Sequence, residues 1–210
     1  MISIPKKSLK RLAHYHYYLK ELASRHRDFV SNQRLAFDLN LSLEQVKEDL
    51  GFLYENIGIS EIHSVDVLLK KAEELLGKNN GKYAVIAGAG NLCRALMSYR
   101  GFKESFGLEI LSLFDTDDRI IGQTIGGREV FHIERMEDII KRLGVNIGII
   151  TTPPEPAQSI ANRMVDAGVT AIWNFSLAVI KVPPYVALQN SSLYTDLLNL
   201  THKMYEHNVQ

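Results

Sequence analysis

The stretch Gly88-Ala89-Gly90-Asn91-Leu92-Cys93 lies between an apolar run, residues 83–87, and a helical pattern that continues to residue 99. A strand, a glycine turn and a helix in this order are typical of the Rossmann fold, which binds the pyrophosphate of a dinucleotide. The first glycine permits the tight turn, and the second lets the phosphates approach the N–H groups at the helix N-terminus. We therefore predict that these six residues form a phosphate-binding turn.

The third position of this motif is normally glycine, and here it is Cys93. Its side chain is small and often buried in proteins, so it can take the place of the packing glycine. A thiol at a helix N-terminus can also have a lowered pKa and react with oxidants. We favour the packing interpretation. Cys93 is the only cysteine, which excludes an intrachain disulfide and predicts a cytoplasmic protein.

A second apolar strand, residues 109–114, ends at Asp115. Its distance along the chain from the glycine turn is close to that of the acidic residue that binds ribose hydroxyls in Rossmann proteins. Asp117 and Asp118 add negative charge that would repel a 2′-phosphate, so we expect NAD(H), although Arg119 acts in the opposite direction. The alternative is that Asp115 only starts a turn.

Two further loops follow later strands. They are Thr151-Thr152-Pro153 and the loop that begins at Asn174. Ligands of open α/β sheets bind outside the carboxyl ends of the strands. We therefore add Thr151, Thr152, Pro153 and Asn174 to the predicted cofactor site, at its nicotinamide half.

The part of the chain after residue 81 alternates strands with helices, which predicts an α/β fold with a doubly wound parallel sheet. The expected strands are 83–87, 109–114, 147–151, 171–174 and 186–189, and the expected helices are 91–99, 135–143 and 156–167. Residues 122–127 are rich in glycine and predict a loop or small hairpin. A final apolar helical pattern packs either on its own sheet or, as an exchanged element, on a second subunit.

Residues 1–76 have only helical patterns, with a helix-turn-helix at about 15–54. Ser31 is expected to cap its first helix, and Ser42 with Gln45 forms a capping box at the start of the next. The polar run at 78–81 marks the expected boundary. We thus predict a domain at 1–80, a Rossmann domain at 81–190 and a C-terminal dimerisation helix at 191–210.

The charge of the chain is balanced, with 24 basic and 24 acidic side chains, so any binding to nucleic acid must come from a local patch. We find no signal peptide and no apolar run long enough for a membrane span, and we expect no membrane partner. Hydride transfer needs an acid or base near the nicotinamide. His132 lacks a carboxylate spaced to orient it, so we interpret it as a surface residue and expect a sensor instead of an enzyme.

The chain resembles the Rex family of bacterial redox-sensing transcriptional repressors over nearly its full length. The matching segments are residues 4–6, 10–12, 17–19, 43–50, 88–96, 114–117, 125–130, 151–153, 173–175 and 182–183. The resemblance implies an N-terminal winged-helix domain, a Rossmann domain and a homodimer with exchanged C-terminal helices. It also implies that double-stranded operator DNA is bound when NAD⁺ prevails and is released when NADH binds.

The expected DNA-binding residues are Ser31, Ser42, Gln45 and Lys47, and Gln45 can pair with adenine. Several departures from the family weaken this face. Glu48 stands where the family has lysine, and residues 48–61 contain no Lys or Arg, although the family's wing at 56–63 is basic. A carboxylate near DNA phosphates is repulsive. At the switch, Ser192 replaces an aspartate that usually pairs with Arg11.

Three hypotheses remain. The first and favoured one is a repressor that senses the NADH/NAD⁺ state and binds operator DNA as a dimer. The second is an NAD(H)-binding protein whose helical domain no longer binds DNA and mediates protein contacts. The third is an oxidoreductase.

Overall fold

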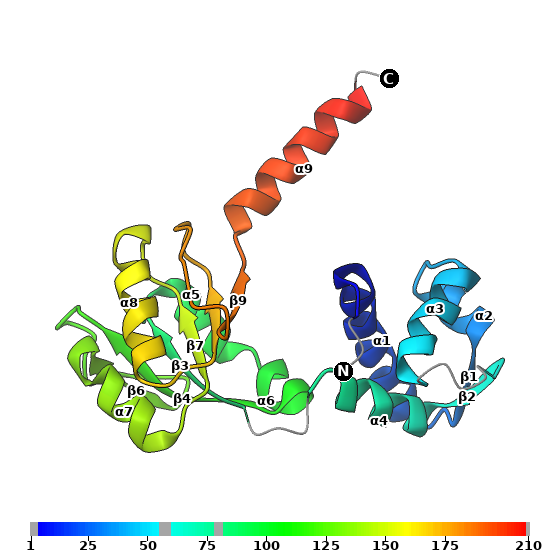
Figure 1. Cartoon of the computed structure of the whole chain (residues 1–210), viewed down its shortest axis with the longest axis horizontal. Helices are drawn as coiled ribbons and strands as arrows, with labels where there is room; N and C mark the ends of the chain where they lie inside the picture. The colour runs from blue at the N-terminus through cyan, green and yellow to red at the C-terminus, as the bar shows by residue number, and fades with distance from the viewer. Residues whose placement is uncertain (1–3, 55–59, 78–81, 209–210) are drawn as a thin grey trace. The chain divides into compact units, whose positions relative to one another are not determined.

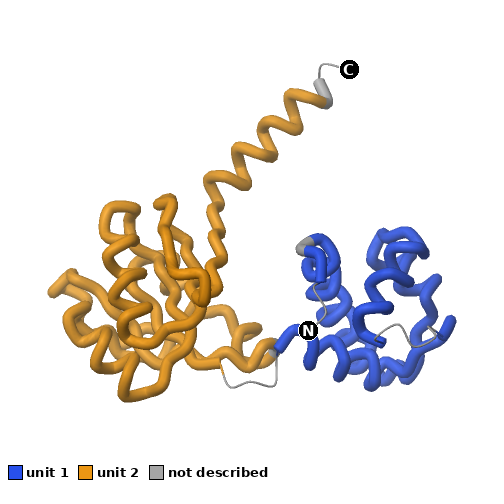
Figure 2. The backbone as a smooth tube through the Cα atoms, viewed as in Figure 1, with its two compact units in different colours: residues 1–80 blue, residues 81–210 orange. Residues whose placement is uncertain are grey.

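The computed structural model of the chain forms two compact units, residues 1–80 and residues 81–210, here called unit 1 and unit 2 (Figure 2). It describes residues 4–54, 60–77 and 82–208. The expected boundary at 78–81 and the first half of the expected wing, residues 56–59, therefore lie outside the described residues. Every helix within the described ranges is too short or too polar to cross a bilayer.

Unit 1 is a small helical body with one two-stranded sheet. Its elements are α1 (Lys6–Ser24), β1 (Phe29–Ser31), α2 (Asn32–Asp38), α3 (Leu43–Leu53), β2 (Ile62–Ser64) and α4 (Val65–Leu75). β1 and β2 pair antiparallel. The core joins all four helices and is built mainly from Leu12, Tyr15, Leu19, Leu35, Val46, Leu50 and Leu68.

The predicted helix-turn-helix is confirmed, together with its caps. Ser31 Oγ accepts a hydrogen bond from Arg34 N at 3.1 Å and caps α2. Ser42 Oγ accepts from Gln45 N at 3.2 Å, and Gln45 Oε1 accepts from Ser42 N at 3.0 Å, which completes the capping box of α3. Asn40 has φ 52° in the turn between them, a conformation that asparagine tolerates better than most residues.

Unit 2 is an α/β layer structure around a seven-stranded sheet (Figure 1). The strands are β3 (Lys82–Ala87), β4 (Leu108–Asp115), β5 (Thr124–Ile125), β6 (Arg128–His132), β7 (Ile147–Ile150), β8 (Ala171–Asn174) and β9 (Ala187–Asn190). The helices are α5 (Asn91–Ser98), α6 (Gly101–Phe106), α7 (Met136–Leu143), α8 (Pro154–Asp166) and α9 (Leu193–Asn208).

The strand order is β5-β6-β4-β3-β7-β8-β9, with every pair parallel except β5 with β6. The chain leaves β3 toward β4 on one side and later returns to pair β7 on its other side. The order of the strands therefore reverses beside β3. This is the topological switch point at which open α/β sheets bind ligands.

Alternate side chains of β3 pack into two different cores. Val85 and Ala87 face the cluster that contains α7 and α8. Ala84 and Ile86 face the cluster that contains Cys93 of α5. This alternation buries both faces of the central strand, as a doubly wound sheet requires.

All five expected strands and the three expected helices of unit 2 are present, with ends shifted by one or two residues. Residues 122–127 do form part of a hairpin: β5 turns into β6 through Gly126 and Gly127, which have φ 57° and 80°. β6 and α6 were not predicted. β6 was missed because Arg128, Glu129 and His132 interrupt its apolar pattern.

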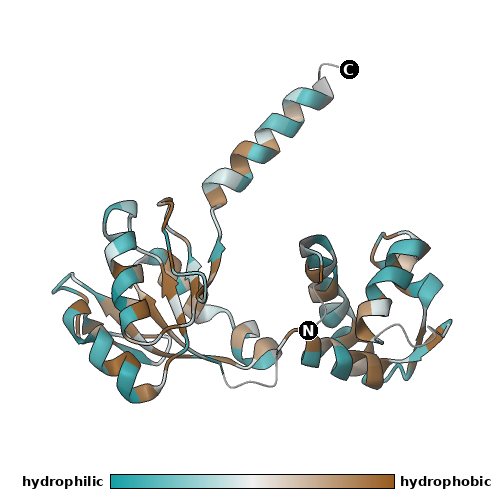
Figure 3. Cartoon of the chain, in the orientation of Figure 1, coloured by the Kyte–Doolittle hydropathy of each residue, from teal (hydrophilic) through white to brown (hydrophobic). Residues whose placement is uncertain are grey.

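The last helix, α9, extends away from the sheet of its own unit (Figure 1). Its apolar side chains are at least half exposed, including Leu193, Leu197, Leu198, Leu200 and Met204. Figure 3 shows brown, hydrophobic segments along α9. No apolar side chain of α7 or α8 is as exposed as those of α9. The alternative that α9 packs on its own sheet is therefore wrong.

Candidate dinucleotide and DNA-binding sites

The glycine turn lies where β3 gives way to α5, between the ends of β4 and β7. Gly88 N donates to Phe114 O of β4 at 2.8 Å, and Thr151 N donates to Ala87 O at 2.9 Å. Thr151 Oγ1 also donates to Gly88 O at 2.6 Å. These bonds bring the glycine turn, the end of β4 and the threonine loop together at the switch point.

The two glycines of the turn have opposite surroundings. Gly88 has φ 97°, and a Cβ there would lie 2.8 Å from Thr151 C and 2.9 Å from Thr152 N. Only glycine fits, because both neighbours are backbone atoms. A Cβ built on Gly90 would meet nothing within 4 Å. The space beside Gly90 suits the close approach of a phosphate to the helix N-terminus.

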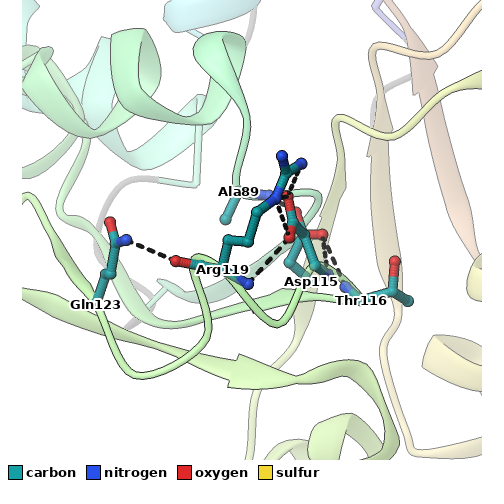
Figure 4. A network of polar contacts seen from close by, with 6 residues as sticks. Ala89, Asp115, Thr116, Arg119 and Gln123 are labelled. Carbon is teal, nitrogen blue, oxygen red and sulfur yellow. Dashed lines mark hydrogen bonds and ion pairs between the residues drawn. The ribbon is translucent and has the colours of Figure 1, made fainter.

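The carboxylate of Asp115 lies against the glycine turn (Figure 4). Its Oδ2 accepts from Ala89 N at 2.6 Å, and its Oδ1 accepts from Thr116 N at 2.7 Å and Asp117 N at 3.0 Å. Asp115 thus starts a turn, which is the alternative role that the sequence left open for it. It also touches the turn that would hold the pyrophosphate, which is where the ribose interpretation needs it.

The threonine loop offers a second polar feature. The hydroxyl of Thr152 is buried and has no hydrogen-bond partner within the described part of the chain. Buried hydroxyl groups without a partner are rare and often point to a missing ligand or water. Pro153 follows as the N-cap of α8, so this loop ends in another helix N-terminus. The open space at Gly90 and the unpaired Thr152 hydroxyl both fit a bound dinucleotide.

Asn174 is buried, and its side chain bonds to its own loop and to the neighbouring strand β9. Nδ2 donates to Ala178 O at 3.0 Å and to Asn190 Oδ1 at 2.9 Å. Oδ1 accepts from the N and Oγ atoms of Ser176 at 3.0 and 2.7 Å. A side-chain amide has two donors and two acceptor sites, and all are used. This geometry favours a role in shaping the loop over the direct ligand contact expected from the sequence.

Cys93 is completely buried among apolar side chains of β3, β4 and β7. Burial raises the pKa of its thiol to about 11. The thiolate is the reactive form, and it is scarce at neutral pH when the pKa is so high. This supports the packing interpretation. Of its neighbours in the motif, Asn91 is exposed at the start of α5 and Leu92 is half-buried.

His132 is not the free surface residue that we expected. It is half-buried, and its Nδ1 accepts from Glu134 N at 3.2 Å, which caps the short 3-10 helix Ile133–Arg135. This capping role accounts for the residue without any part in catalysis.

The candidate DNA face is the exposed side of α3 in unit 1. Ser42, Gln45 and Lys47 are all exposed there. The capping box uses Gln45 Oε1, the atom that pairing with adenine also requires, so Gln45 must share or exchange this bond to read a base. Lys47 Nζ lies 3.7 Å from Glu61 Oε1, which partly neutralises the charge expected to meet phosphate.

Arg11 is held inside unit 1. Its Nε and Nη2 donate to the two carboxylate oxygens of the fully buried Asp49 at 2.6 and 2.7 Å. Glu48 Oε2 lies 3.8 Å from Arg11 Nη2. The carboxylates of Asp49 and Glu48 raise the pKa of Arg11. The pair ties α1 to α3. Ser192, which stands at the position of the family's aspartate, caps α9 by accepting from Thr195 N at 3.1 Å.

A helix-turn-helix unit and a Rossmann unit with open space at its glycine turn define the class of this protein: a DNA-binding fold joined to a dinucleotide-binding fold. Comparisons with known proteins agree with both halves. Two family models match, a putative DNA-binding protein N-terminus at residues 3–51 and a CoA binding domain at residues 79–187.

The chain is similar over nearly its whole length to curated redox-sensing transcriptional repressors named Rex. It is 32% identical to the protein of Bacteroides fragilis, covering 96% of this chain and 91% of that one. It is 37% identical to the protein of Carboxydothermus hydrogenoformans, covering 94% of this chain and 95% of that one. The chain belongs to the Rex family of redox-sensing transcriptional repressors.

Solved structures show the same similarity. A Rex-family repressor called RSP, crystallised with NADH, has a TM-score of 0.87 at 31% identity, with 100% of this chain and 98% of that chain covered. RSP crystallised with NAD⁺ and operator DNA has a TM-score of 0.91 at 31% identity, with 100% and 96% covered.

Proposed function

We propose that this chain is a repressor that binds operator DNA through unit 1 and releases it when NADH binds to unit 2. The observation that carries the proposal is the glycine turn at the switch point, with open space at Gly90 and the Asp115 carboxylate beside it. The RSP complexes with NADH and with NAD⁺ and operator DNA support it.

Each predicted site residue has a role in this proposal. The pyrophosphate lies on the N–H groups at the start of α5, within Gly88, Ala89, Gly90, Asn91, Leu92 and Cys93. Asp115 binds the adenosine ribose, and Thr151, Thr152 and Pro153 meet the nicotinamide half, with Asn174 shaping the loop beside them. When bound, the cofactor supplies only the redox signal, carried by its nicotinamide ring. The residues that contact the DNA are Ser31, Ser42, Gln45 and Lys47.

We also propose the domain roles expected from the sequence: DNA binding in 1–80, NAD(H) binding in 81–190 and dimerisation in 191–210. The exposed apolar side chains of α9 support a homodimer in which this helix packs on the partner. A two-fold dimer would read an operator with two half-sites. The cytoplasm, where NADH and DNA are both present, is the proposed location.

Control by NADH is a linkage between two binding equilibria. NADH shifts the protein away from DNA only to the extent that it binds the DNA-incompetent arrangement more tightly. The same coupling free energy must appear as weaker NADH binding when operator DNA is present.

In a second candidate function, the protein binds NAD(H) but does not bind DNA. Glu48 is exposed on α3, and Lys47 lies near Glu61, so the face meant for phosphate carries carboxylates. In this alternative unit 1 mediates protein contacts, and NAD(H) binding is unchanged.

One experiment separates the two. Genomic fragments bound by the purified full-length chain are selected with and without NADH and then measured by fluorescence anisotropy. We expect a fragment whose binding weakens with salt and is relieved by NADH. Lys47→Glu should abolish this binding. Lys70→Glu, the same charge change at an exposed residue of α4, is the matched control and should retain most of it. NADH binding without any bound fragment would favour the second candidate.

A further inference from the structure

The loop after β4 contains an arginine, Arg119, whose guanidinium is already paired with a carboxylate. Arg119 Nε lies 2.9 and 3.2 Å from the two carboxylate oxygens of Asp117, and its Nη2 lies 2.8 Å from Oδ2. Arg119 N also donates to Asp117 Oδ1 at 3.0 Å. One carboxylate therefore binds both the guanidinium and the backbone of Arg119.

This pair is fixed to the predicted ribose site through its backbone. Asp117 N donates to Asp115 Oδ1 at 3.0 Å, and Asp115 Oδ2 in turn accepts from Ala89 N of the glycine turn. Gln123 Nε2 donates to Arg119 O at 2.8 Å and holds the far end of the loop. Arg119 is thus only four residues after Asp115, whose carboxylate would bind the ribose, and both residues belong to one hydrogen-bonded turn.

The position matters because two related ligands differ there. NAD(H) presents a 2′-hydroxyl on the adenosine ribose, which a carboxylate can bind. NADP(H) presents a 2′-phosphate, which Rossmann proteins accommodate with a nearby arginine. The planar guanidinium is well suited to phosphate because it can donate two parallel hydrogen bonds.

Resting on the proposed NAD(H) site, we propose that Asp117 is a specificity-determining residue that makes this site reject NADP(H), by occupying Arg119. Asp117 acts in two ways. It takes the hydrogen bonds that Arg119 would offer a 2′-phosphate, and its own negative charge would repel that phosphate. Arg119 is thus a masked phosphate ligand.

The ionisation of Asp117 keeps this arrangement in place. Hydrogen bonds from Arg119 lower the pKa of Asp117 to about 2, so the carboxylate stays charged throughout the pH range of a living cell. The guanidinium is mostly exposed and could turn toward a ligand once its partner is removed.

The test is isothermal titration of the full-length chain with NADH and NADPH at one fixed ionic strength. Asp117→Ser keeps a side-chain oxygen for the turn and removes the partner of the guanidinium. We expect the ratio of NADH to NADPH affinity to fall by about tenfold or more, the effect of one hydrogen bond to a charged group. Adding Arg119→Ala to Asp117→Ser should restore most of the original ratio.

Asp118→Ser is the matched control, because it removes the same charge from the neighbouring residue. We expect a much smaller change, since the described hydrogen bonds that Arg119 donates all go to Asp117. Asp117→Asn is a second variant that keeps the side-chain shape, and it should change the ratio in the same direction.

Three results would overturn the proposal: an unchanged ratio in both Asp117 variants, an equal change in Asp118→Ser, or a gain that persists without Arg119. Retained NADH binding shows that a variant is folded. If the unsubstituted chain bound no NADH, the proposed function itself would fail, which is distinct from a chain that binds NADH and gains no NADPH affinity.

Discussion

Replacing either glycine of the turn with alanine should have opposite effects on stability. In Gly88→Ala the new Cβ lies 2.8 Å from Thr151 C and 2.9 Å from Thr151 O, and the residue must adopt φ 97°. A left-handed conformation costs about 1–2 kcal/mol and an overpacked core side chain about 1–3 kcal/mol. Because both clashes are with backbone that cannot turn away, we expect unit 2 to lose about 2–5 kcal/mol of stability.

Gly90→Ala is the matched substitution. Gly90 has φ −75°, which alanine accepts, and its Cβ would enter open space. Stability should be unchanged or higher by about 0.4–1 kcal/mol, because alanine reduces the entropy of the unfolded chain. The methyl group would occupy the space proposed for the pyrophosphate, so NADH affinity should fall by about tenfold to a hundredfold.

Both variants are measured by urea unfolding and by titration with NADH. The reasoning requires loss of stability in Gly88→Ala and loss of NADH affinity alone in Gly90→Ala. Normal NADH binding by Gly90→Ala would show that the phosphates do not approach this turn. Normal stability of Gly88→Ala would show that the contact with Thr151 is not as tight as described.

Three other experiments test separate parts of the molecule. Cys93 should react with a thiol reagent at pH 8 only on unfolding, because the thiol is buried with a pKa of about 11; rapid labelling of the folded chain would contradict this. Arg11→Leu should cost unit 1 about 3–5 kcal/mol in urea unfolding by leaving Asp49 buried without its partner, and a double variant with Asp49→Leu should recover most of the loss. Glu61→Gln should strengthen DNA binding by releasing Lys47, whereas Lys47→Ala should reduce the slope of log affinity against log salt by about 1; an unchanged slope would remove Lys47 from the phosphate contacts.

Local patterns in the sequence predicted the elements that depend on neighbours along the chain. Ser42 and Gln45 are three residues apart, and the geometry of a helix start alone brings their side chains to each other's backbone. Gly88 was predicted for the same reason, since a strand that turns directly into a helix needs a residue with positive φ. These features could be predicted because their geometry is set within one turn of chain.

β6 shows the limit of such patterns. Val130 is completely buried in this strand, but Arg128 and Glu129 precede it and break the apolar run. The strand forms because β4 offers a free edge, with Leu113 opposite Val130. Hydrogen bonds to a neighbouring strand override a weak local pattern.

The contents of the candidate site divide in the same way. The sequence by itself determined that a dinucleotide turn, an acidic residue after the next strand and a helix-turn-helix are present. Only the tertiary structure decided that Asp117 pairs with Arg119, that the Asn174 side chain bonds to Asn190 of β9 and that Arg11 pairs with Asp49. The physical reason is that residue types and their spacing restrict the backbone, whereas the partner of a polar side chain is chosen by packing and by competition among the groups that folding brings within reach.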